Sequence, residues 1–77
     1  MSQEAAQHHH NASEHFSQAA YHHKQAQRLH EVGRYHEAAH HANLAQAHAH
    51  YGSVYATEAI KTYMNEYGHS RSALAVG

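Results

Sequence analysis

The sequence predicts an all-α fold built as a long antiparallel helical hairpin, and three observations support this. Proline is absent, the four glycines are far apart, and alanine or another small residue recurs every seven positions. A chain without breakers favours long helices, and a seven-residue repeat is typical of helices that pack along a common seam. The sequence predicts one hairpin domain over residues 1–67 and a mobile tail over residues 68–77.

The first helix is predicted over residues 11–32. Asn11 followed by Glu14 has the spacing of a capping box, so a firm start is expected at Asn11, with frayed residues before it. Gly33 suits a helix C-terminus, and residues 33–34 form the predicted turn. Two heptad rows of this helix share one face: Ala5, Ala12, Ala19 and Ala26, and three residues further on His8, His15, His22 and Leu29.

The second helix is predicted over residues 35–67 and repeats this arrangement. Gly52 marks a point where the helix can kink, but the heptad register continues through it, which favours one long helix. The corresponding rows are Ala38, Ala45, Gly52 and Ala59, and three residues further on His41, His48, Tyr55 and Thr62.

Large apolar side chains are too few for a 77-residue chain to bury much surface alone. The short turn makes the helices antiparallel neighbours, and such a hairpin leaves one seam open on its outer side. Two hairpins can close this seam, so the sequence predicts a homodimer that forms a four-helix bundle.

Composition excludes several classes of partner. The formal net charge is -1 and no basic patch exists, so nucleic-acid binding is not expected. No apolar stretch is long enough for a membrane span, and the first residues do not resemble a secretory signal, so a cytoplasmic protein is expected. Cysteine is absent, which removes thiolate sites, whereas 13 of the 77 residues are histidine.

This histidine content predicts transition-metal binding for storage, buffering or delivery, because neutral imidazole is a good ligand for Zn, Cu(II), Ni and Co. His36 and His40 lie one turn apart on one helix. With the turn centred near residue 34, positions that sum to about 68 should face each other across the hairpin. The predicted ligands are His15, His22, His23, His30, His36, His40, His41 and His48.

That numbering rule also predicts specific neighbours. His30 is expected near Ala38 and His41, and His22 and His23 are expected between the levels of His41 and His48. His15 is expected near Gly52, within reach of His48 or His50.

One stretch resembles the centre of a tetratricopeptide repeat. The segment from Glu31 to Ala45 carries the pattern Gly-x-Tyr-x-x-Ala-x6-Ala at Gly33, Tyr35, Ala38 and Ala45. The repeat's usual Trp and closing Pro are not found, and there is no second copy, so the resemblance implies a helix–turn–helix hairpin and no repeat array. The chain also resembles small His/Ala-rich helical proteins of bacteria.

No enzyme is expected, because aspartate and cysteine are absent and the usual nucleophilic triads cannot form. His36-Glu37-Ala-Ala-His40 does match the zincin pattern, but no third-ligand motif accompanies it. Glu37-Ala-Ala-His40 also matches the unit of di-iron bundles, which needs an inward glutamate on the other helix as well. The alternatives to metal binding are a pH-responsive interaction module, suggested by the many imidazoles, and a tetratricopeptide-like adaptor.

Overall fold

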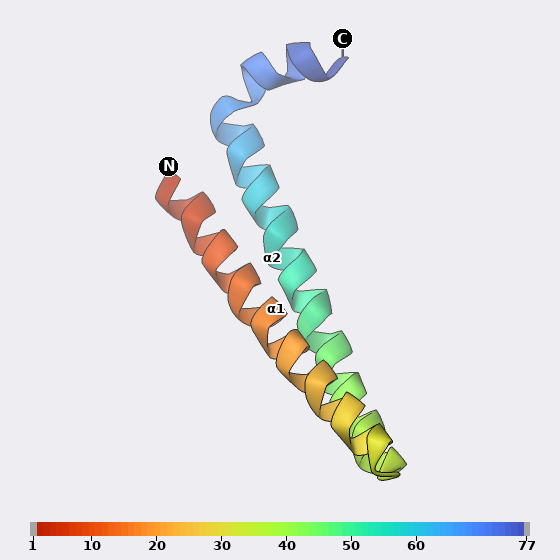
Figure 1. Cartoon of the computed structure of the whole chain (residues 1–77). Coiled ribbons are helices and arrows are strands. Elements are labelled where there is room, and N and C mark those ends of the chain that lie inside the picture. The colour runs from red at the N-terminus through yellow and green to blue at the C-terminus, as the bar shows by residue number, and fades with distance from the viewer. Residues whose placement is uncertain (1, 77) are drawn as a thin grey trace.

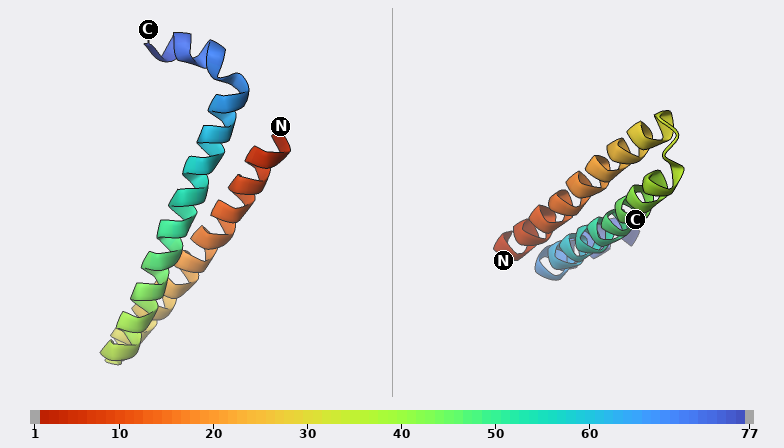
Figure 2. Two further views of the ribbon diagram at one scale, coloured as in Figure 1. Left: turned by 180° about the vertical axis from the view of Figure 1, so that it is seen from behind. Right: turned by 90° about the horizontal axis from the view of Figure 1, so that it is seen from below.

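Two antiparallel helices form the whole of the described chain (Figure 1). The structure is a computed structural model that describes the backbone of residues 2–76 and the side chains of residues 3–68. Helix α1 spans Ser2–Glu31 and helix α2 spans Tyr35–Val76. Figure 2 shows that the two helices run side by side and that α2 extends past the N-terminal end of α1. The predicted all-helical hairpin is therefore confirmed.

Helix α1 begins at Ser2, so the start expected at Asn11 is wrong. Asn11 makes no capping contact. Its Oδ1 accepts a hydrogen bond from Nε2 of Gln7 at 3.2 Å, one helical turn earlier. The preceding residues include Ala5 and Ala6 and contain no glycine or proline, so nothing in their propensities stops the helix.

The turn between the helices is a Schellman motif centred on Gly33. The Arg34 N–H donates to the Leu29 carbonyl at 2.8 Å, and the Gly33 N–H donates to the His30 carbonyl at 3.1 Å. Gly33 has φ of 81°, a left-handed conformation that favours glycine. The Arg34 carbonyl then accepts the first helical bond of α2 from Ala38, so the chain reverses over very few residues.

Helix α2 runs without a break through Gly52, which is buried. A Cβ atom added at Gly52 would lie 2.8 Å from Cε1 of Phe16, so this glycine makes room for an aromatic ring of α1. The helix also continues past Gly68 to Val76, so the expected tail at 68–77 is instead helical as far as Val76. That segment contains no proline and includes alanine and leucine, which favour helix. His69 lies outside the described side chains.

The core is a double row of small residues between the helices. No large side chain is fully buried among residues 3–68. Since alanine projects little beyond the backbone, these rows allow the two helices to approach closely. The most buried apolar positions are Ala12, Ala19, Ala26, Ala38, Ala45 and Ala59.

We expect Ala45→Leu to destabilise the hairpin by about 1–3 kcal/mol, because Ala45 is fully buried against α1 and a larger side chain overpacks the seam. Ala47→Leu is the matched control, since Ala47 is exposed on the same helix. Urea unfolding followed by circular dichroism at 222 nm measures both free energies of unfolding. Equal midpoints for the two variants would contradict the close-packed seam.

Candidate functional site

Six aromatic rings form a continuous column along the seam, contributed alternately by α2 and α1. Neighbouring ring centroids are 5.2, 5.8, 5.2, 5.6 and 6.3 Å apart along the column. The alternation follows from the antiparallel hairpin, because each ring of one heptad row fits between two rings of the facing row. In order, the rings are His41, His22, His48, His15, Tyr55 and His8.

Two pairs of histidines in this column join the helices through their Nδ1 atoms. The Nδ1 atoms of His15 and His48 are 3.0 Å apart, and those of His22 and His41 are 2.9 Å apart. These are hydrogen-bond distances, so in each pair one Nδ1–H donates and the other Nδ1 accepts. The ring planes are inclined by 33° and 29°, so the pairs repeat nearly the same geometry one heptad apart.

The environment of His22 favours its neutral form. Burial lowers the pKa of His22, and the neighbouring imidazoles of His41, His48 and His40 lower it further. His15, His22, His41 and His48 are all half-buried. A neutral ring leaves one nitrogen with a free lone pair, which is the form that binds a metal ion or accepts a hydrogen bond.

Four of the eight predicted ligands are therefore in the seam, and the other four are exposed: His23, His30, His36 and His40. The structure confirms that His22 lies between His41 and His48 and that His15 reaches His48. The exposed His30 ring lies beside the turn, 5.4 Å from the Tyr35 ring and tilted by 50° to it.

The His36-Glu37-Ala-Ala-His40 segment does not assemble an inward-facing site. Both histidines and Glu37 are exposed. Glu37 forms an ion pair with Arg34, whose Nη2 donates to its Oε2 at 2.7 Å. This pair stabilises the start of α2, where a carboxylate also interacts favourably with the helix dipole. The His40 ring meets the edge of His41 at 5.5 Å.

Sequence reasoning missed the part that tyrosine has in the column. The Tyr55 ring stacks on His15 at 5.6 Å with an interplanar angle of 10°, and Tyr51 lies 5.6 Å from the same ring. Tyr55 was identifiable because it occupies the heptad row of His41 and His48. The predicted numbering rule, a sum of about 68 for facing positions, was also inaccurate. The residue numbers of rings in contact add up alternately to 63 and 70, because the two rows interleave.

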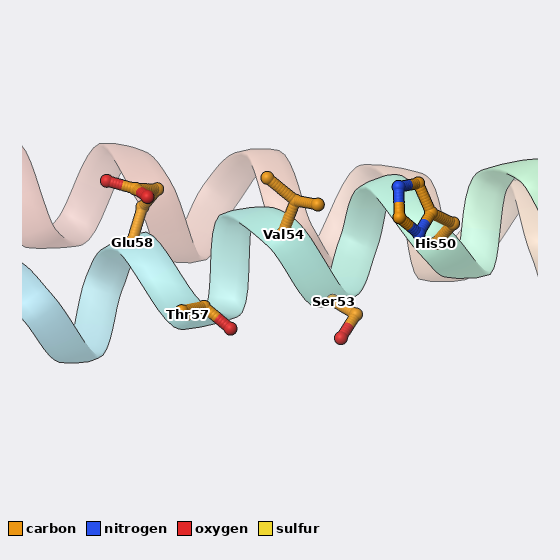
Figure 3. A pocket seen from close by; sticks show the side chains of 5 residues that line it. All are labelled: His50, Ser53, Val54, Thr57 and Glu58. Atoms are coloured by element: carbon orange, nitrogen blue, oxygen red, sulfur yellow. The ribbon is translucent and has the colours of Figure 1, made fainter.

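No three histidine or glutamate side chains converge as a metal-ligand group within the part of the chain that the structure describes. A pocket of about 190 Å³ lies elsewhere, along α2, and Figure 3 shows its lining of His50, Ser53, Val54, Thr57 and Glu58. Its two ionisable residues, His50 and Glu58, are separated by about 12 Å of helix rise, too far to hold one ion together. The seam is therefore the stronger candidate for a site.

No protein-family model, curated protein or solved structure matches the chain. None of the helices, within the residues described, is long and apolar enough to cross a membrane. A function for this chain therefore has to be inferred from the geometry of the ring column.

We expect the stability of the hairpin to be constant above the ordinary pKa of histidine, about 6.5, and to fall below it. Because the pKa of His22 is lowered in the folded chain, the unfolded chain binds protons first as the pH drops. When both rings of a hydrogen-bonded pair are protonated, neither Nδ1 atom can accept, so the hydrogen bond is lost as well. Free energies of unfolding measured between pH 8 and pH 5 test this.

His22→Gln should flatten that pH dependence, and His10→Gln, an exposed change on the same helix, should leave it as it is. An identical slope in the wild type and in His22→Gln would contradict the assignment to the seam.

Proposed function

We propose that this protein binds transition-metal ions of the Zn, Cu(II), Ni or Co type at the two interhelical histidine pairs and stores, buffers or delivers them. The observation that carries the proposal is the repeated approach of two Nδ1 atoms to within 3.0 Å, once for His15 with His48 and once for His22 with His41. Two imidazole nitrogens this close can share one ion once their rings rotate to point at it.

The chemistry of the pairs favours reversible binding. Their imidazoles are half-buried, and the lowered pKa of His22 reduces competition from protons at the pair that contains it. Each pair supplies two protein ligands, which leaves coordination positions for water. Such partly open sites suit storage or delivery better than permanent structural metal binding, and we propose a binding protein rather than an enzyme.

The test is a calorimetric titration at pH 7.5 that compares two double variants. His41→Ala with His48→Ala removes one member of each pair, so tight binding of Zn²⁺ or Cu²⁺ should weaken about tenfold or more. His9→Ala with His10→Ala removes two exposed histidines of α1 and should have little effect. Metal should also raise the melting temperature of the wild type, since it binds the folded form.

Helicity at 222 nm has to be matched between the two double variants, so that lost binding is not lost folding. Equal losses from both would show that binding scales with histidine number. An unchanged wild-type melting temperature in excess Zn²⁺ and Cu²⁺ would contradict metal binding altogether.

The same histidine pairs favour a second candidate, a pH-responsive interaction module without metal. Two hydrogen-bonded imidazoles keep their bond when one ring is protonated and lose it when both are. Acid would therefore loosen the seam and expose it to a partner. A sharp acid transition in a protein that binds no metal would favour this module. The third hypothesis is a tetratricopeptide-like adaptor, which would show neither metal binding nor a sharp acid transition.

We also propose that the chain forms a homodimer. Helix α2 has 42 residues against 30 in α1, so its C-terminal part extends beyond the partner helix (Figure 1). Near this extension Ile60, Tyr63, Met64 and Tyr67 have the spacing of one helix face, and all four are exposed. An apolar stripe of this kind suits a second copy, whose identical stripe can pack against it in a two-fold arrangement.

Light scattering over a concentration series should give twice the chain mass of 8.6 kDa for the wild type. Ile60→Ser combined with Met64→Ser should shift the protein toward the monomer by about tenfold or more in dissociation constant, because both side chains leave the stripe. Val32→Ser, at an exposed position near the turn, is the control. A fully helical wild type with the mass of one chain throughout would contradict the dimer.

A further inference from the structure

The two histidine pairs have a geometry that specifies the coordination of the ion, and this inference rests on the proposed metal binding. We infer that each pair is a tetrahedral two-histidine site, so that one chain holds two Zn²⁺-like ions, one between His15 and His48 and one between His22 and His41. In each site the ion would be bound by the two Nδ1 atoms that share a hydrogen in the metal-free pair.

If the ring centres keep their places, their separation sets the angle at which a shared ion could be coordinated. A metal–imidazole bond of about 2.0–2.1 Å, plus about 1.1 Å from nitrogen to ring centre, puts each ring centre roughly 3.2 Å from the ion. Two such rings are then about 5.2 Å apart at a tetrahedral angle, about 4.5 Å apart in cis positions of a square plane, and about 6.4 Å apart in a linear complex. The centroid separation is 5.2 Å in both pairs, which is also the value that a straight N–H···N bond of this length produces. A tetrahedral ion is therefore the one that fits without movement of the ring centres.

The ring centres can stay in place when the ion enters. A tetrahedral ion needs its two nitrogens roughly 3.3 Å apart, a few tenths of an ångström more than the 2.9 and 3.0 Å observed. Rotation of the rings about their centres supplies this difference without moving the helices. The buried alanines Ala19 and Ala45 pack in the same seam and keep the backbones in register while the rings rotate.

The proton balance of the exchange is simple. In a neutral pair one ring carries its hydrogen on Nδ1, where it bridges, and the other carries its hydrogen on Nε2. When an ion binds both Nδ1 atoms, the bridging hydrogen is exchanged through solvent to Nε2 of its own ring. No net proton is released above the ordinary histidine pKa, whereas below it each protonated pair must lose a proton to bind.

The column also predicts where a third site can be built. His8 follows Tyr55 at the end of the column, with centroids 6.3 Å apart, and it occupies the same heptad row as His15 and His22. Its Nδ1 is buried and has no hydrogen-bond partner among the described side chains. Tyr55→His would place a second imidazole opposite this nitrogen and complete a third pair.

The experiment is a Co²⁺ titration of the full chain at pH 7.5, followed by visible absorption, because tetrahedral Co²⁺ absorbs far more strongly than octahedral Co²⁺. We expect intense bands that saturate at about two equivalents for the wild type, about one for His22→Ala and about three for Tyr55→His. Zn²⁺ should bleach the bands, and the heat of Zn²⁺ binding should not depend on the ionisation enthalpy of the buffer. His10→Ala, at an exposed position, should behave like the wild type.

The inference is overturned by a weak octahedral spectrum, or by a stoichiometry that His22→Ala and Tyr55→His leave unchanged while the variants remain helical at 222 nm. Either result, accompanied by saturable binding in calorimetry, would leave the proposed metal-binding function in place. The absence of any binding of Co²⁺ or Zn²⁺ would overturn both.

Discussion

Close approach of the two helices along a seam of alanine and glycine is the constraint on which the other features depend. Alanine brings little apolar area, so this seam contributes less to stability than a leucine-based coiled coil would. What it provides is proximity: with small residues in one heptad row, the side chains of the next row meet across the interface. At Gly52 an added methyl group would collide with the ring of Phe16 unless that half-exposed ring moved.

Imidazoles in the heptad row that follows the alanines by three residues destabilise the fold unless their nitrogens have hydrogen-bond partners, because unpaired polar groups in an interface lose their hydration. The pairs His15–His48 and His22–His41 meet this requirement within the chain itself. The alanine rows alone do not distinguish one heptad register from the next. The Schellman turn at Gly33 does, because it fixes which heptads face each other. In that register both imidazole pairs form, so polar groups that would otherwise be unpaired in the interface have partners.

The same arrangement links folding to protonation and, under the proposed function, to metal binding. The hydrogen that bridges a pair, the extra proton taken up in acid and the proposed metal ion would compete for the same two Nδ1 atoms. The neutral hydrogen-bonded pair is stable near neutral pH because burial lowers the pKa of His22. Under the proposed function a bound metal ion would replace the hydrogen bond as the link between the helices, and acid would remove either link. A chain with so small a core has little other stability to offset such changes.

The heptad rows of alanine and histidine, the glycine at the turn and the absence of proline were enough to predict the hairpin, its continuous second helix and the contacts of His22 with His41 and His48. They misplaced the start of α1. Asn11 and Glu14 have the spacing of a capping box, but Asn11 lies in the middle of α1, where its side chain binds Gln7. The pairing of the histidine nitrogens, in contrast, is decided by the tertiary structure. Side-chain rotation and the interleaving of two antiparallel rows are decided by packing, so only the folded hairpin joins His22 to His41 through Nδ1 and leaves His36 exposed to water.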